Sequence, residues 1–191
     1  MKSICIYCGS SPGADPSYIE AAKTVGRVLA ERKIELVYGG ANVGLMGALA
    51  ESVLAHDGEV TGIMPEFLVS KEVAHQSLTR LHVVKSMHER KRLMAELADG
   101  FVALPGGMGT LEELFEILTW AQLGLHTKPC GLLNVNGYFD HLIKFLECSV
   151  EQRFVHQEHF KTIHVDTDVE KLIARFDAYE APHNSKWIDR E

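Results

Sequence analysis

GFVALPGGMGTLEELFEIL, residues 100–118, passes from a continuously apolar run through a glycine-rich turn into a segment with helical periodicity. The same order of apolar run, turn and helical segment recurs along the chain. A strand that is apolar throughout, rather than alternating, is expected where helices cover both faces of a parallel sheet. The repeated pattern therefore predicts strands that alternate with helices.

Apolar runs bounded by Gly, Pro or Ser predict strands at 3–8, 35–38, 59–64, 81–84, 100–104, 131–135 and 163–165. Helical spacing predicts helices at 17–32, 44–56, 87–98, 111–123, 139–152 and 169–179, with a loop or short helix at 65–80. This alternation predicts an α/β fold, a Rossmann-like doubly wound parallel sheet. We expect a single domain over residues 1–180 and a frayed tail at 181–191.

The composition of the 191 residues excludes several classes of partner. Asp and Glu number 26 against 19 Lys and Arg, for a formal net charge of -7, which gives no field that would gather nucleic acid or an anionic membrane surface. No apolar run approaches the roughly 18 to 20 residues that span a bilayer, and the N-terminal residues lack a secretory signal pattern. We therefore expect a cytoplasmic protein with no nucleic-acid or membrane partner, in which a local site holds any anionic ligand.

Two cysteines, Cys5 and Cys8, have the CxxC spacing of redox and zinc sites. They lie in the first predicted strand, where residues three apart point to opposite faces. Redox pairs of this spacing open a helix instead, and no second CxxC completes a zinc set. We expect neither a disulfide nor a metal site.

Four unusual segments follow predicted strands, at the edge where an open parallel sheet binds its ligands. They are GSSPG (9–13), GGANVGLMG (39–47), SMHERK (86–91) and PGGMGTLEE (105–113). Glycine lets the backbone approach a ligand closely, and the helix that follows presents free amides, so phosphate is the natural guest. Neither a Walker loop nor a dinucleotide fingerprint is present, so no dinucleotide cofactor is indicated. Each glycine run could alternatively be a plain turn from strand to helix.

The cationic segment predicts an unusual helix face. At 100 degrees per residue, Arg90 and Lys91 flank the apolar stripe that contains Met94, whereas Arg92 and Glu96 point the other way. The two inward cations could simply extend along the rim of the core. Because cations in a first helical turn oppose the helix dipole, a local anion explains them better.

Glu112 and Glu113 have two interpretations. Acidic residues in a first helical turn offset the helix dipole, and capping boxes of the form S/T-x-x-E are predicted at Ser17–Glu20, Ser86–Glu89 and Thr110–Glu113. However, a carboxylate beside a phosphate-binding loop is repulsive unless a cation lies between them. A ribosyl oxocarbenium, formed when an N-glycosidic bond breaks, is such a cation.

Across about residues 3–150 the motifs CGSS, VYGGANVGLMG, MHERK, LPGGMGTLEEL, TWAQLG and KPCGLLNVNGYFD closely resemble the LOG family of cytokinin riboside 5'-monophosphate phosphoribohydrolases. The resemblance implies a Rossmann-like homodimer that needs no metal or redox cofactor. It implies cleavage of a purine nucleoside 5'-monophosphate to free base and ribose 5-phosphate. The base would be adenine or an N6-modified adenine, so both cytokinin activation and AMP nucleosidase-like salvage fit.

The resemblance also implies site residues. Arg90 and Glu113 match the catalytic arginine and glutamate of the family. The positions that match its substrate-binding residues are Glu72, Lys91, Gly107, Met108, Gly109, Thr110, Leu111, Glu112 and Thr119. Two departures from the family pattern, Ala41 and Met108, bear on base preference rather than on the reaction. Because a guanidinium is a poor proton donor, we expect Arg90 to act electrostatically.

Two other functions compete with hydrolysis. PGGxGT also occurs in molybdenum-cofactor carrier proteins, which resemble this family in fold and bind a phosphorylated ligand without turning it over. Such a carrier has no need of Glu113 as a reactive carboxylate. The label of lysine decarboxylase fits poorly, because the chain is short for a pyridoxal-phosphate fold and no lysine is placed as an obvious Schiff base.

Overall fold

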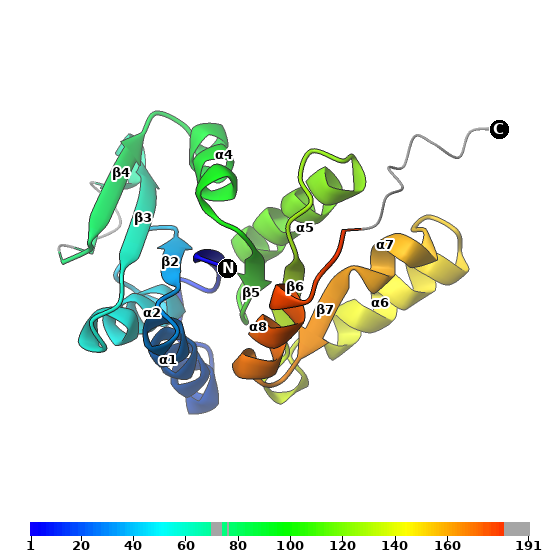
Figure 1. The fold of residues 1–191 in the computed structure, drawn as a ribbon, viewed down its shortest axis with the longest axis horizontal. Coiled ribbons are helices and arrows are strands. Elements are labelled where there is room, and N and C mark those ends of the chain that lie inside the picture. The colour runs from blue at the N-terminus through cyan, green and yellow to red at the C-terminus, as the bar shows by residue number, and fades with distance from the viewer. Residues whose placement is uncertain (70–73, 76, 182–191) are drawn as a thin grey trace.

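The computed structural model describes residues 1–69, 74–75 and 77–181, and these contain one seven-stranded sheet with helices on both faces (Figure 1). The strands are β1 (Ser3–Tyr7), β2 (Glu35–Tyr38), β3 (Val60–Pro65), β4 (Arg80–Val84), β5 (Phe101–Ala103), β6 (Cys130–Leu133) and β7 (Ile163–Asp166). Their order is β4-β3-β2-β1-β5-β6-β7, and every neighbouring pair is parallel. The predicted fold class is confirmed.

Helices cover the two faces in two groups (Figure 1). One face packs against α1 (Pro16–Glu31), α2 (Gly44–Ala55) and α8 (Val169–Asp177). The other packs against α4 (Met87–Leu97), α5 (Met108–Gln122) and α6 (Asp140–Glu151). The shorter elements are α3 (Glu66–Val69), the 3-10 turn η1 (Val135–Gly137) and α7 (Gln157–Lys161). The last two were not predicted, because such short segments show no helical periodicity.

Two hydrophobic cores lie on opposite faces of the sheet. Cys5, in β1, and Cys8, directly after it, belong to different cores. Cys5 packs in the core of α4 and α5, and Cys8 in the core of α1 and α2. Both thiols are free, and burial raises the pKa of the Cys5 thiol well above its ordinary value. The expected opposite orientation is confirmed, and the buried thiols are poor nucleophiles.

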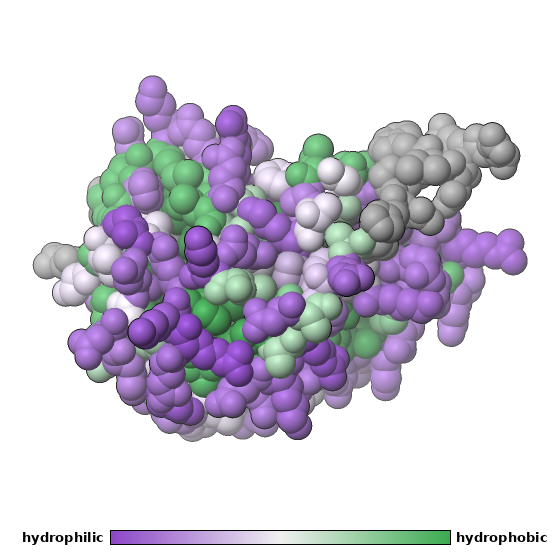
Figure 2. Space-filling model, viewed as in Figure 1, coloured by the Kyte–Doolittle hydropathy of each residue, from purple (hydrophilic) through white to green (hydrophobic). Residues whose placement is uncertain are grey.

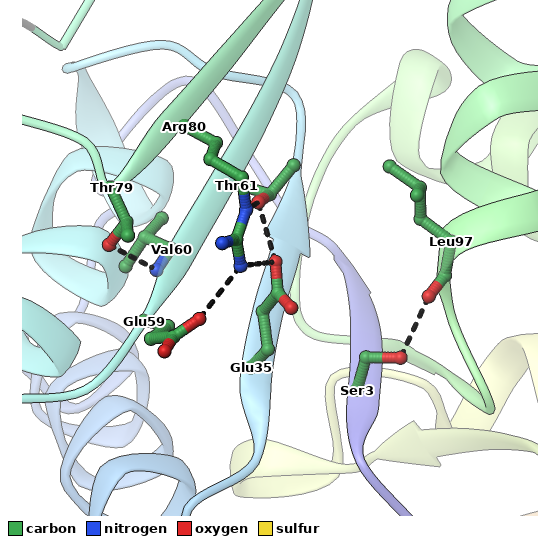
Figure 3. Close-up of polar contacts among 8 residues, drawn as sticks. All are labelled: Ser3, Glu35, Glu59, Val60, Thr61, Thr79, Arg80 and Leu97. Carbon is green, nitrogen blue, oxygen red and sulfur yellow. Dashed lines mark hydrogen bonds and ion pairs between the residues drawn. The ribbon is translucent and has the colours of Figure 1, made fainter.

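A polar network fastens β4 at the edge of the sheet (Figure 3). The Arg80 guanidinium contacts the Glu35 carboxylate at 2.8 Å and the Glu59 carboxylate at 2.7 Å, and its Nε donates to the Thr61 hydroxyl at 3.0 Å. These contacts link three neighbouring strands and the residue that precedes β3. They lie near the amino ends of the strands, away from the edge where ligands bind, and so serve the fold.

The observed helix starts correct the capping boxes predicted at Ser17 and at Ser86. α1 is capped by Asp15, whose carboxylate accepts from the Ser17 amide at 2.8 Å, so the predicted cap at Ser17 is wrong. Ser86 does cap α4 by accepting from the Glu89 amide at 3.1 Å, but the Glu89 carboxylate binds the amide of Lys85 rather than that of Ser86.

No helix in the described part of the chain has the length and apolar character to cross a membrane.

Candidate active site

The strand order reverses its direction of growth between β1 and β5. The chain leaves β1 towards α1 on one face and leaves β5 towards α5 on the other, so the two exits diverge and open a crevice. A cleft of about 280 Å³ occupies it. Its walls include Ser10 after β1, Gly39 after β2, Arg90 on α4, and residues 107–110, 112 and 113 at the start of α5.

The amino end of α5 provides an anion site. The helix begins at Met108, three residues before the predicted start, and its N-cap Gly107 makes no side-chain capping bond. The first amides of a helix have no partner within it, and those of α5 belong to residues that line the cleft. Together with the positive end of the helix dipole, they suit a phosphate group.

The earlier start also shows that Thr110 and Glu113 form no capping box, and that prediction is wrong. Thr110 is the third residue of the helix and is buried, with its side chain packed against the α-carbon of Gly106. Glu113 lies in the second turn, too far along the helix to cap it. Capping therefore does not explain the carboxylate of Glu113.

Glu113 instead faces Arg90 across the cleft. Its Oε1 lies 3.5 Å from Arg90 Nη2, and both side chains are only 11% exposed. Burial raises the pKa of the Glu113 carboxyl above its ordinary value, and the Arg90 guanidinium offsets part of that rise. The Nε of Arg90 is buried and has no hydrogen-bond partner among the described residues. The pair is a desolvated carboxylate and guanidinium, a setting in which electrostatic effects on a bound ligand are strong.

Gly39 makes room for the guanidinium. A Cβ atom at this position would lie far closer to Arg90 Nη2 than the 3.0 Å that real Cβ atoms keep. The guanidinium therefore occupies the space that a side chain at the end of β2 would fill. This is the structural reason for the first glycine of GGANVGLMG.

Lys91 points to different carboxylates. It is buried and forms ion pairs with Glu112 and, at 3.0 Å, with Glu116. Burial alone would lower the pKa of Lys91, but its hydrogen bonds to the two carboxylates raise the pKa above its ordinary value. The anions beside both inward cations of α4 are therefore side chains of α5. Lys91 is not among the residues that line the cleft.

The other predicted site residues occupy varied positions. Met108 is 86% exposed at the mouth of the cleft, whereas Leu111 packs against the core. Thr119 lies beyond the cleft and donates to the Phe115 carbonyl at 2.7 Å. Glu72 falls outside the described residues. Ser10 and Gly39 lie in glycine-rich segments that were predicted to form the site, but neither residue was predicted individually. Their place directly after β1 and β2 was the available signal.

No group of three or more His, Cys, Asp or Glu side chains that could hold a metal ion occurs within residues 1–69, 74–75 and 77–181. The cleft offers amides, one guanidinium and carboxylates. Such a set can bind an anion at one end and stabilise a cation near Glu113.

A family model described as "Possible lysine decarboxylase" matches residues 46–176. The chain is 49% identical over 174 residues to a cytokinin riboside 5'-monophosphate phosphoribohydrolase from Rhodococcoides fascians, covering 91% of this chain and 88% of that protein. It is 45% identical over 180 residues to a protein of the same name from Arabidopsis thaliana, covering 94% and 83%.

Solved structures with the same fold are more distant in sequence. The molybdenum cofactor binding protein from Rippkaea orientalis aligns with a TM-score of 0.69 at 22% identity, covering 93% of this chain and 97% of that one. The molybdenum cofactor carrier protein from Chlamydomonas reinhardtii aligns with a TM-score of 0.69 at 19% identity, covering 93% and 96%. At such identities the likeness establishes the fold alone.

Proposed function

Because the chain belongs to the LOG family of cytokinin riboside 5'-monophosphate phosphoribohydrolases, we propose that it hydrolyses the N-glycosidic bond of a purine nucleoside 5'-monophosphate. The products are the free base and ribose 5-phosphate. The observation that carries the proposal is the buried Glu113 carboxylate, which faces Arg90 in the same cleft as the uncapped start of α5.

The 5'-phosphate binds at the start of α5, where the free amides of the first turn accept an anion. Glu113 follows Met108 by five residues, or about 7.5 Å along the helix axis. This separation is comparable with the span of ribose 5-phosphate from phosphorus to the anomeric carbon. A phosphate at the helix end therefore brings the anomeric carbon near the Glu113 carboxylate.

Glu113 stabilises the positive charge that develops on the ribose as the bond breaks. Water adds to the anomeric carbon, and the electron pair of the broken bond leaves with the base, which takes a proton from solvent. Arg90 keeps its own proton and acts by charge, on the phosphate and ribose hydroxyls or on the departing base. The carboxylate must be ionised for this role; burial raises its pKa, and the facing guanidinium offsets part of that rise.

The description of the matching family model suggests decarboxylation of lysine, but the structure supports this activity less well than hydrolysis. A Schiff-base lysine must lose its proton to react. Lys91, the one lysine among the buried polar residues of the described chain, is paired with two carboxylates that favour its protonated form. Its environment opposes such chemistry.

The proposal extends to the substrate, the assembly and the compartment. The base is adenine or an N6-modified adenine, so both AMP nucleosidase-like salvage and cytokinin activation fit.

A homodimer is supported by exposed apolar side chains on β4, α4 and α5, at Leu81, Val83, Leu97 and Phe115. Figure 2 shows hydrophobic side chains gathered over β4 at the upper left. The free cysteines suit the reducing cytoplasm.

Product analysis tests the proposal. Purified protein is incubated with AMP or with N6-isopentenyladenosine 5'-monophosphate in the presence of inorganic phosphate, and the products are separated by chromatography. Hydrolysis gives equal amounts of base and ribose 5-phosphate. Ribose 1,5-bisphosphate would indicate phosphorolysis instead, and unchanged substrate would refute the proposal.

A further inference from the structure

The turn of residues 105–107, which leads into α5, has all three of its carbonyl groups engaged. The first accepts from the Gly9 amide at 3.0 Å, and the third accepts from the Leu111 amide at 3.1 Å. The middle carbonyl, at Gly106, accepts a hydrogen bond from the Tyr138 hydroxyl at 2.6 Å. Carbonyl oxygens that would repel a phosphate are therefore committed elsewhere.

The bond from Tyr138 differs in kind from the other two. Backbone amides make those two, whereas this one depends on a single side chain 32 residues away in the sequence. Among the described residues, no other side chain donates a hydrogen bond to the turn. Among the side chains of the described residues, the Tyr138 hydroxyl alone holds the carbonyl of the Gly106–Gly107 peptide.

Local structure holds the Tyr138 ring in place. The preceding residue, Gly137, has a φ of +70 degrees, and a Cβ there would lie 2.6 Å from Asp140 Oδ2, so the tight turn requires glycine. The ring packs edge-on against Tyr18, with centroids 5.8 Å apart, and against Phe139 at 5.1 Å. Tyr138 is 43% exposed, and its hydroxyl is positioned by a tight turn and two aromatic contacts.

Tyr138 lines a different cavity from the one that contains Arg90 and Glu113. Tyr138 and Tyr18 line a second cavity of about 290 Å³. Gly9, Ser10 and Gly107 line both cavities, whereas Tyr138 is absent from the lining of the cleft that contains Arg90 and Glu113. In a trans peptide the carbonyl and the following N–H point in opposite directions. A Gly106 carbonyl held towards Tyr138 therefore directs the Gly107 amide away from Tyr138, and Gly107 itself lines the cleft.

We propose that Tyr138 is a positioning residue that fixes the Gly106–Gly107 peptide so that its amide faces the 5'-phosphate of the substrate. The inference rests on the proposed function, because it assumes that a phosphate binds at the start of α5. Since the phosphate is bound equally in the ground state and the transition state, losing the bond raises KM and leaves kcat almost unchanged.

The test compares Tyr138→Phe with Tyr18→Phe. Both variants lose one hydroxyl from the same cavity and keep the aromatic ring, but within the described chain the Tyr18 hydroxyl makes no hydrogen bond. Tyr138→Phe is expected to raise KM for AMP about fivefold to tenfold, the scale of one lost hydrogen bond, with kcat within about twofold of the wild type. The Kd for ribose 5-phosphate, measured by calorimetry, should increase by the same factor in Tyr138→Phe. Tyr18→Phe should have the KM and Kd of the wild type.

Equal KM and Kd values in Tyr138→Phe and the wild type would overturn the inference, as would an equal effect of Tyr18→Phe. A loss of kcat with a lowered Tm would assign Tyr138 a merely structural role and would also overturn it. If the wild type binds ribose 5-phosphate but releases no base, the proposed function fails while the Kd comparison still decides the role of Tyr138. A wild type that binds no ribose 5-phosphate would overturn the inference, and it would refute the proposed function as well if it also releases no base.

Discussion

Replacing Gly39 with alanine tests whether the position of the Arg90 guanidinium matters for turnover. The added methyl group would overlap Arg90 Nη2. Gly39 is not among the glycines with positive φ, so alanine fits its backbone. The clash involves the end of a flexible side chain, and the guanidinium can therefore move without unfolding the protein. We expect little change in Tm.

The expected loss of activity follows from the displacement. Van der Waals contact requires a separation of about 3.5 Å, so Nη2 has to move by about 1 Å or more from its place 3.5 Å from Glu113 Oε1. A misplacement of about 1 Å in an active site can reduce the rate by about 100-fold. We therefore predict that Gly39→Ala lowers kcat/KM for AMP by about 100-fold, measured as release of free base.

A second glycine provides the matched control. A Cβ at Gly26 would lie 2.7 Å from the Leu49 carbonyl and from Ser52 Cβ, where α1 meets α2 in the core away from the cleft. Gly26→Ala should lower Tm and leave kcat per folded molecule unchanged. In an Arg90→Ala background, Gly39→Ala should have no further effect on the affinity for AMP, because the two residues act as one unit. A Gly39→Ala variant with wild-type kcat/KM would refute the reasoning.

Three further predictions concern pH, stability and metal ions. Because burial raises the pKa of Glu113, kcat/KM should begin to fall on acidification at a higher pH than it would for a glutamate with an ordinary pKa. The same shift makes the folded protein bind this proton more tightly than the unfolded chain does. Its contribution to the free energy of unfolding is therefore fully present below the unfolded pKa and is lost as pH rises through the folded pKa. A pH profile with no acidic decline above the ordinary glutamate range would contradict this, as would denaturation data with the opposite trend. Ser86→Ala removes the cap of α4 and should lower Tm by about 2–4 °C in a calorimetric scan; an unchanged Tm would show that the cap is dispensable. Treatment with a chelator should leave base release unchanged, and inhibition that added metal reverses would reveal a metal site.

Local patterns in the sequence were enough to predict the strands, most helices and the edge of the sheet that holds the site. The face of α4 that turns inward also followed from periodicity, because Arg90 and Lys91 are both buried, as the helical spacing indicates. The start of α5 did not follow, since Met108 and Gly109 read as loop residues in a glycine-rich stretch. Because α5 starts at Met108, Glu113 lies in the second turn of the helix and cannot cap it.

Contacts between distant segments could not be predicted. Helical spacing places Arg90 and Lys91 on one face, but which carboxylate of α5 each one meets depends on how the two helices pack. The bond from Tyr138 to Gly106 joins a turn after β6 to the loop after β5, and no local pattern indicates it. The strand order brings these segments together, and that order is a property of the whole fold.

The most direct test of the central claim compares the wild type with Glu113→Gln on AMP and on N6-isopentenyladenosine 5'-monophosphate. The substitution removes the charge and keeps the shape, so affinity measured by calorimetry should change little while kcat falls by about 100-fold to 1000-fold. The ratio of the two wild-type rates identifies the preferred base. Equal base release by both proteins would contradict the role of Glu113. Binding without base release by the wild type would replace hydrolysis with the carrier function.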